Sequence, residues 1–229
     1  MKYKVLFYLS IISILGVTCN NKNMKPKSYT YLALGDSYTI GTSCLIHERY
    51  PHQLTDSLKQ KGINIATPKI IAKNGWTTDE LSEGIDTAKV LEQYDLVTLL
   101  IGVNNQYQGR DIGNYKKEFN QLLNRAIKFA GDNRNKVLVI SIPDWSVTPF
   151  AKDKDNKSIA NEIDAYNAIN FEACKYARVQ YINVTEISRK AKTDSTLIAH
   201  DGLHPSGKMY TLWVKEIFPK ALSALTNKY

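Results

Sequence analysis

A regular alternation of short apolar runs with helical segments is the feature that most constrains the fold of this chain. Runs of β-prone residues recur along the sequence, and segments with helical spacing lie between them. Strands separated by helices form a parallel sheet with helices on both faces. We therefore expect one α/β domain around a five-stranded parallel sheet. The strand candidates are residues 29–35, 64–75, 95–102, 136–144 and 179–185.

The segments between these runs have the patterns of helices. Residues 49–62 place Leu54 and Leu58 four positions apart and end on Gly62, which is typical of a helix stop. Residues 114–130 carry apolar side chains on one face. Further helices are expected over residues 77–94 with an interruption at Gly84, over residues 161–178, and after Pro205.

The ends of the strand candidates carry polar residues and glycines. Ser37, Gly75 and Asn104 each lie at or just beyond the C-terminal end of a different candidate. In open parallel sheets, binding sites form beyond the carboxyl ends of the strands. We therefore expect these residues, far apart in sequence, to share one edge of the sheet.

The first strand candidate runs into Gly35, Asp36 and Ser37, which fit either a simple turn or a catalytic nucleophile. Acyl transfer by a serine needs a hydroxyl, a base, a carboxylate that orients the base, and donors for the oxyanion. A serine at a strand-to-helix turn holds its hydroxyl clear of the sheet, and its N–H near a helix N-terminus can face an anion. Ser37 is therefore the candidate nucleophile.

The segment DGLHP holds the candidate base. His204 follows Asp201 by three residues, close enough for the carboxylate to hold one ring nitrogen while the other faces the serine. Gly202 and Pro205 favour a shaped loop over a helix. Taken alone, an Asp-x-x-His pair also fits a surface turn.

Two further positions offer donors to an oxyanion. Gly75 has a backbone N–H near a helix start in NGWTTDEL, and Asn104 has a side-chain amide just past a buried strand in LLIGVNNQ. Each also fits an ordinary role, a helix-entry turn for Gly75 and a turn-forming asparagine for Asn104.

Four segments together carry a family resemblance. ALGDSYTIG, NGWTTDEL, LLIGVNN and DGLHP occur in this order between Ala33 and Pro205. They resemble the four sequence blocks of the GDSL esterase/lipase family, also called SGNH hydrolases. The resemblance implies a three-layer α/β/α sandwich of flavodoxin-like type. Tyr38 stands where the family name has leucine, a position that varies among these enzymes.

The same resemblance implies a role for each candidate residue. Ser37 is the nucleophile and donates one oxyanion hydrogen bond, while Gly75 and Asn104 donate two more. His204 is the general base and acid, and Asp201 orients it. The implied activity is a serine-dependent carboxylic ester hydrolase that forms an acyl-enzyme and acts on short acyl esters or lysophospholipids.

Two other functions fit the same sequence. One is a carbohydrate O-acetylesterase that acts on glycans, and the other is a non-catalytic lipoprotein binding module that keeps the fold. We expect no cofactor and no metal, because the acidic residues and histidines lack ligand spacing such as H-E-x-x-H. A substrate wall is expected from four aromatic residues, which would otherwise pack the loops against the domain: Trp76, Tyr107, Trp145 and Phe150.

The N-terminus predicts export. Two lysines precede an apolar stretch from Val5 to Thr18, and Cys19 follows directly. The stretch is shorter than the roughly 20 residues of a spanning helix, and its layout is that of an export signal. Cys19 resembles the acylated cysteine of bacterial lipoproteins; an uncleaved anchor or cleavage nearby is the alternative. We expect an export signal over 1–18, a tether over 19–28 and the hydrolase domain over 29–229, in a protein of the bacterial cell envelope.

The net charge of +8 at pH 7 raises the question of nucleic-acid binding. The lysines and arginines are spread along the whole chain, and no basic run is interleaved with aromatic residues. We interpret the surplus as a solvated surface and expect no nucleic-acid partner. The expected partners are a small-molecule or glycan ester, and a membrane only through a lipid anchor.

Two cysteines remain beyond the N-terminal segment, Cys44 and Cys174. In an oxidising envelope compartment they could pair as a disulfide. They equally fit two separate buried thiols, and the sequence leaves both readings open.

Overall fold

The structure, a computed structural model, describes Met1 and residues 27–226. The expected export signal beyond Met1, Cys19 and most of the expected tether therefore lie outside the described residues. Lys27, near the end of that tether, is bound to the domain: its ammonium group lies 2.8 Å from a carboxylate oxygen of Asp95. No helix in the described part of the chain is long and apolar enough to cross a membrane.

The described strands form one five-stranded sheet, and every neighbouring pair is parallel, which confirms the predicted α/β fold. The order is β2-β1-β3-β4-β5, so the chain moves to one side of β1 and then returns to its other side at β3. This reversal is the switch point beyond which sites form in such sheets. The strands are β1 (Tyr31–Gly35), β2 (Lys69–Ala72), β3 (Leu96–Leu100), β4 (Val137–Ile140) and β5 (Gln180–Ile182).

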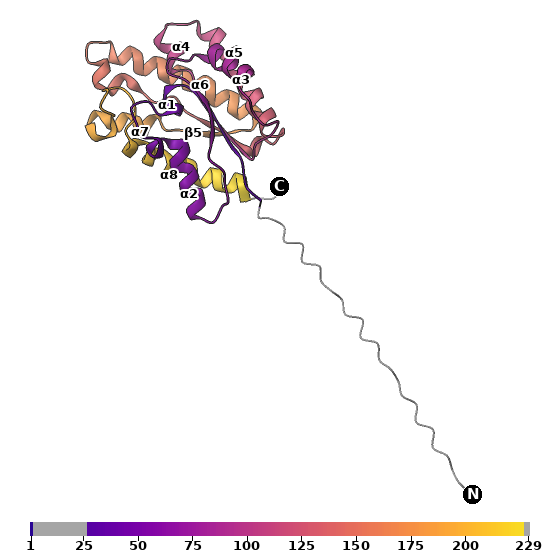
Figure 1. The fold of residues 1–229 in the computed structure, drawn as a ribbon. Helices are drawn as coiled ribbons and strands as arrows, with labels where there is room; N and C mark the ends of the chain where they lie inside the picture. The colour runs from indigo at the N-terminus through magenta and orange to yellow at the C-terminus, as the bar shows by residue number, and fades with distance from the viewer. Residues whose placement is uncertain (2–26, 227–229) are drawn as a thin grey trace.

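Helices cover both faces of the sheet, as the three-layer architecture requires (Figure 1). One layer holds α2 (Tyr50–Gln60) and α8 (Gly207–Thr226). The other holds α3 (Thr78–Thr87), α5 (Ile112–Phe129) and α6 (Asn156–Ala177). The shorter helices are α1 (Ser37–Ile40), α4 (Val103–Tyr107) and α7 (Thr185–Arg189), and the 3-10 turns η3 (Trp145–Val147) and η4 (Pro149–Ala151) follow β4.

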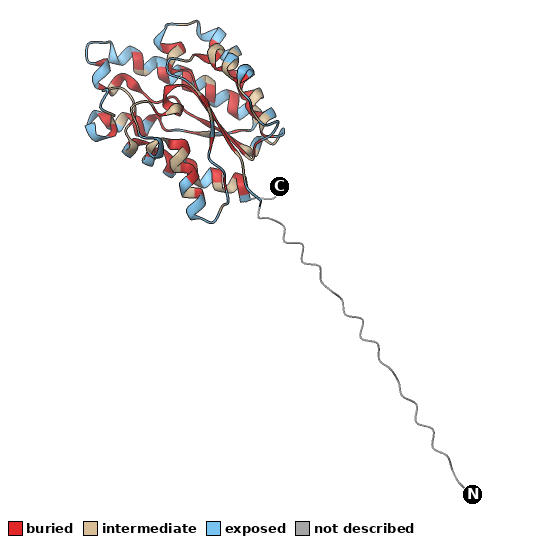
Figure 2. Cartoon of the chain, in the orientation of Figure 1, coloured by how far each residue is buried: buried red, intermediate tan, exposed pale blue. Residues whose placement is uncertain are grey.

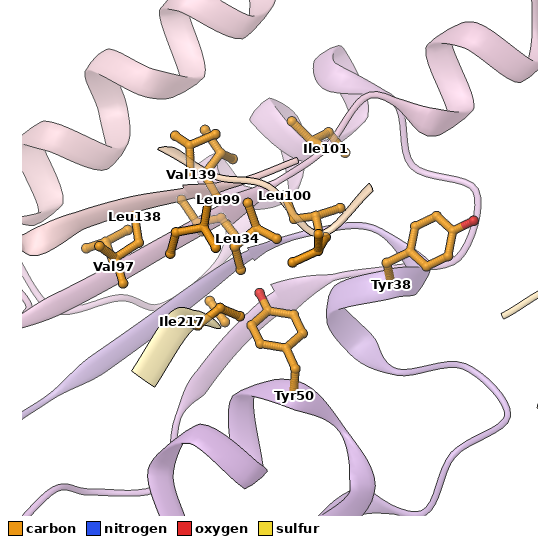
Figure 3. Close-up of a cluster of buried hydrophobic side chains, with 14 of the residues drawn as sticks. Leu34, Tyr38, Tyr50, Val97, Leu99, Leu100, Ile101, Leu138, Val139 and Ile217 are labelled. Carbon is orange, nitrogen blue, oxygen red and sulfur yellow. The ribbon is translucent and has the colours of Figure 1, made fainter. Parts of the chain in front are cut away.

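The core lies along the strands and the inward faces of the helices (Figure 2). Figure 3 shows Leu34 and Leu100 of the sheet in one cluster with Tyr38, Tyr50 and Ile217, which come from α1, α2 and α8. Each leucine that is fully buried contributes about 1.5–3 kcal/mol to folding. The core therefore holds the short helix that carries Ser37 firmly on the sheet.

A small polar network crosses this core. Thr98, in the middle of β3, has its Oγ1 atom 3.0 Å from the Tyr31 hydroxyl and 3.2 Å from the Tyr50 hydroxyl. Because buried polar atoms are costly without partners, the three hydroxyl groups stabilise one packing arrangement. The Tyr50 bond ties α2 to the centre of the sheet.

Helix α3 differs from the sequence-based expectation. It continues through Gly84 without interruption and ends at Thr87 rather than near residue 94. A Cβ atom at Gly84 would lie 2.1 Å from the indole ring of Trp76. The glycine therefore permits close packing of that ring and does not break the helix.

Both cysteines of the described part are free thiols. The Cys44 thiol donates to the carbonyl oxygen of Pro205, with 3.1 Å between Sγ and O. Cys174 is buried in α6, and burial raises the pKa of its thiol to about 12. The structure thus favours two separate thiols.

Candidate active site

Ser37 is the first residue of α1, immediately beyond β1. Asp36 caps this helix, because its Oδ1 accepts the Tyr38 N–H at 3.0 Å. A Cβ atom at Gly35 would lie 2.3 Å from the carbonyl oxygen of Leu100, so only glycine fits this point of the strand. The sharp exit from the sheet places Ser37 at its carboxyl edge.

Asp201 and His204 meet within one loop before α8. The ring Nδ1 of His204 lies 2.6 Å from Oδ2 of Asp201, while Oδ1 accepts the N–H groups of Leu203 and His204, both at 2.9 Å. Gly202 has a φ of 73°, a left-handed conformation that turns this loop. Burial opposes ionisation of Asp201, but the hydrogen bonds that it accepts outweigh burial and hold the pKa of this carboxyl well below its usual range.

The two expected oxyanion donors come from the loops after β2 and β3. Gly75 is exposed, with a φ of 82°. Asn104 lies in α4, and its Nδ2 donates to the carbonyl oxygen of Trp76 at 2.9 Å. This bond fixes the amide of Asn104 against the segment that carries Gly75.

The side chain of Asn105 also joins the start of α4 to the start of α3. Its Oδ1 accepts the Thr78 N–H at 3.1 Å, and its Nδ2 donates to the Thr78 hydroxyl at 2.7 Å. Asn105 is buried, so both bonds are shielded from water. The starts of α3 and α4 are therefore held as one unit.

One pocket of about 210 Å³ joins these elements. Its polar end includes Ser37, Gly75, Asn104 and His204, which come from four separate segments. Asp201 reaches the pocket through its hydrogen bond to His204. The remaining lining residues are Tyr38, Asn74, Val103, Tyr107, Trp145, Phe150 and Leu203.

Three aromatic residues form the apolar wall of this pocket. Ring centroids lie 5.5 Å apart for Tyr107 and Trp145, and 5.9 Å apart for Trp145 and Phe150. Trp145 is buried, and its indole N–H donates to Oε1 of Gln106 at 2.8 Å. Tyr107 and Phe150 are about half exposed, so they form the rim that an entering ligand meets first.

A profile of the GDSL-like lipase/acylhydrolase family matches residues 33–212. The chain belongs to this family. It is therefore an ester hydrolase of the GDSL/SGNH type, and the resemblance carried by the four sequence blocks is confirmed. The matched range includes all five candidate residues of the catalytic centre.

Solved structures with this fold include three esterases and acylhydrolases. The lipase/acylhydrolase from Enterococcus faecalis is 15% identical with a TM-score of 0.67, covering 88% of this chain and 99% of its own. Esterase EstA from Pseudoalteromonas sp. is 17% identical (TM-score 0.65; 87% and 100%). The acetylxylan esterase Axe2 from Geobacillus stearothermophilus is 15% identical (TM-score 0.63; 90% and 98%). None of the curated proteins matches the sequence.

Trp76 is placed differently from the other expected wall residues of this GDSL hydrolase. It does not line the pocket, and its ring packs over Gly84 of α3. The chain turns at Gly75 with a positive φ, after which the Trp76 side chain packs against the core. Three of the four expected wall residues therefore share the pocket.

The structure also adds residues that sequence reasoning missed in this GDSL hydrolase. Asn74 lines the pocket beside Gly75, and its Oδ1 accepts a hydrogen bond from Thr42. Ser43 donates to Asp201. The position of Asn74 next to Gly75 could have indicated its place in the site. Nothing in the sequence, however, connects Ser43 with Asp201, a residue 158 positions away.

Asp36 of the GDSL motif is fully buried beside the nucleophile. Its Oδ2 finds no hydrogen-bond partner among the described residues. Burial raises the pKa of this carboxyl to about 7, and the hydrogen bond from the Tyr38 N–H opposes that rise. Among all the described residues, the active site included, no group of three or more His, Cys, Asp or Glu side chains is arranged to hold a metal ion.

Proposed function

We propose that this GDSL hydrolase cleaves carboxylic esters through an acyl-enzyme on Ser37, with His204 as general base and acid and Asp201 as its orienting carboxylate. The observation that carries the proposal is one pocket shared by Ser37, Gly75, Asn104 and His204. A serine at a helix start, a carboxylate-bound imidazole and two amide donors make up the parts that acyl transfer requires.

In the first half of the reaction, the Ser37 oxygen attacks the ester carbonyl carbon while Nε2 of His204 takes the hydroxyl proton. The carbonyl electron pair moves to oxygen, and the resulting oxyanion accepts hydrogen bonds from Ser37 N–H, Gly75 N–H and Asn104 Nδ2. The pair then returns, the C–O bond breaks, and the leaving alkoxide takes the proton from His204.

In the second half, water attacks the acyl-serine carbonyl and His204 again takes and returns the proton. The acid leaves and the Ser37 hydroxyl is restored. Nδ1 of His204 is engaged by Asp201 throughout, which leaves Nε2 to exchange protons in the pocket. Asn104 has two amide hydrogens and uses one on Trp76, so a second remains for the oxyanion.

For the substrate we propose short or medium acyl esters, including lysophospholipids. The aromatic wall of Tyr107, Trp145 and Phe150 offers apolar surface to an acyl chain. The Lys154 ammonium group lies 5.7 Å from the Phe150 ring centroid, so the rim also offers a positive charge to an anionic head group.

A second candidate is O-deacetylation of glycans. The exposed faces of Tyr107 and Phe150 at the rim can stack on a sugar ring, with the acetyl group reaching the polar end. The solved acetylxylan esterase with this fold is one such enzyme by its own description.

The test is a panel of chromogenic esters with acyl lengths from C2 to C12, run beside lysophospholipid and acetylated xylan. We expect turnover that vanishes in Ser37→Ala, with an unchanged circular dichroism spectrum. Activity confined to the acetylated glycan would favour the second candidate. A fully active Ser37→Ala variant would overturn Ser37 as the nucleophile. No turnover of any ester by the wild type would overturn the catalytic proposal in favour of a binding module.

We also propose that the protein is exported and anchored to the bacterial envelope through a lipid on Cys19. The support is the layout of residues 1–19 in the sequence, two lysines and an apolar stretch before the cysteine. Labelled palmitate should enter the wild type and not Cys19→Ser, and the variant should move from the membrane to the soluble fraction. Equal labelling of both proteins would refute the anchor.

A further inference from the structure

A hydroxyl on the turn after α1 reaches the carboxylate that holds His204. Oγ of Ser43 donates to Oδ2 of Asp201 at 2.6 Å. The same Oδ2 atom lies 2.6 Å from Nδ1 of His204. None of the proposed chemical steps uses the hydrogen bond between Ser43 and Asp201.

The other donors to this carboxylate are local. Leu203 and His204 supply two backbone N–H groups and one ring nitrogen, all from the loop that carries Asp201. Such bonds orient the carboxylate only within its own loop. Among the hydrogen bonds of the described residues, the one from Ser43 ties the carboxylate to the segment that follows the nucleophile.

The turn of residues 41–44 is bound at both ends. At one end the N–H groups of Gly41 and Thr42 donate to the Ser37 carbonyl oxygen, at 3.0 and 3.1 Å. At the other end the thiol of Cys44 donates to the carbonyl oxygen of Pro205. The turn therefore spans from the nucleophile to the residue after His204.

Ser43 occupies the turn in an unfavourable backbone conformation. Its φ is 63°, in the left-handed region that serine rarely adopts. Such conformations persist where the surroundings over-determine them, and they gather at functional sites. A glycine would fit this backbone without strain, but it would lack the hydroxyl that reaches Asp201.

We propose that Ser43 is a positioning residue, whose hydroxyl holds the Asp201 carboxylate, and through it the His204 ring, in register with the nucleophile. The inference rests on the proposed function of the catalytic residues. Ser43 does not line the pocket, and its hydroxyl acts through Asp201.

Two variants test this role. Ser43→Ala and Ser43→Gly both remove the hydroxyl, and the glycine variant also relieves the backbone strain. We expect each to lower kcat about tenfold, the effect of one hydrogen bond to a charged group, with KM changed less than about twofold. The melting temperature of Ser43→Gly should not fall. Ser57→Ala is the matched control, because the Ser57 hydroxyl bonds the Gln53 carbonyl oxygen within α2 and no other group of the described residues.

A double-mutant cycle separates positioning from general support of the fold. In an Asp201→Ala background, removal of the Ser43 hydroxyl should cost less than about twofold in kcat, because the group on which it acts is gone. A structural role would give a full, additive tenfold loss in both backgrounds.

The outcomes distinguish the two proposals. If Ser37→Ala is inactive while Ser43→Gly keeps wild-type kcat, the positioning role is wrong and the catalytic proposal stands. If both Ser43 variants are unfolded by circular dichroism, or the losses are additive, the hydroxyl is structural and the inference also fails. If Ser37→Ala stays fully active, the proposed function itself fails.

Discussion

The side chain of Asn104 donates from Nδ2 to the carbonyl oxygen of Trp76, 2.9 Å away. This bond joins the segment after β3 to the segment after β2, so the two expected oxyanion donors keep a fixed position relative to each other. The next residue, Asn105, bonds Thr78 instead and is buried. Two adjacent asparagines thus serve different ends, one facing the pocket and one facing the core.

This division predicts opposite phenotypes for the two asparagines. Asn104→Ala should lower kcat by roughly 10²–10³ with little change in KM, since one oxyanion donor is lost. Asn105→Ala should instead lower the free energy of unfolding by about 1–3 kcal/mol, because the Thr78 N–H loses its partner. Kinetics and urea unfolding on both variants check the assignment, and equal kinetic losses at wild-type stability would contradict it.

Asp36 predicts a pH dependence of stability. Its pKa is about 7 in the folded state, above the ordinary value of 3.8, so the native state binds more protons between these limits. The contribution of Asp36 to stability is therefore largest at low pH, declines as pH rises from the ordinary pKa of 3.8 to the folded-state pKa of about 7, and then levels off. Asp36→Asn keeps an oxygen for the Tyr38 N–H and cannot ionise. We expect the variant to gain roughly 2–4 kcal/mol relative to wild type between pH 4 and pH 8.

Urea unfolding at several pH values between 4 and 8 measures that difference directly. A constant difference between wild type and Asp36→Asn across the range would show that Asp36 does not titrate there.

Gly35 predicts a steric limit at the exit of β1. Gly35→Ala would place Cβ 2.3 Å from the Leu100 carbonyl oxygen, and neither backbone can move away without breaking the sheet. We expect a loss of about 3 kcal/mol or more in unfolding free energy, or an insoluble protein. Gly109→Ala is the control: apart from its chain neighbours, no described residue has an atom within 4 Å of a Cβ added there, so the strain would come from its φ of 63°. Similar losses in both variants would argue against a steric cause.

The aromatic rim predicts acyl-chain selectivity. In Phe150→Ala, we expect KM for a C8 ester to rise about three- to tenfold more than KM for a C2 ester. The reason is that the ring no longer offers apolar surface to the longer acyl chain. Phe171→Ala is matched in exposure, 49% against 44%, but lies on α6 outside the pocket lining, and should leave both KM values unchanged. An equal change in KM at every acyl length would show that the rim does not select substrates by acyl length.

Most of the fold could be read from local pattern. Strand β3 is a continuous run of buried residues, as expected of a parallel strand covered on both faces. The turn at Gly35 and the bond between Asp201 and His204 involve residues close in sequence, so motif spacing was enough to predict them. Where a local signal had two meanings, as at Gly84, the sequence predicted a break and the structure shows a packing contact with Trp76.

The sequence by itself determined the alternation of strands and helices, the family, and the five candidate residues of the catalytic centre. The tertiary structure decided which side chains share the pocket, because the direction of Trp76 and the reach of Ser43 depend on contacts between distant segments. Parallel strands bring such segments to one edge, but side-chain direction follows from packing after the sheet has formed. The local periodicity of the sequence does not specify that packing.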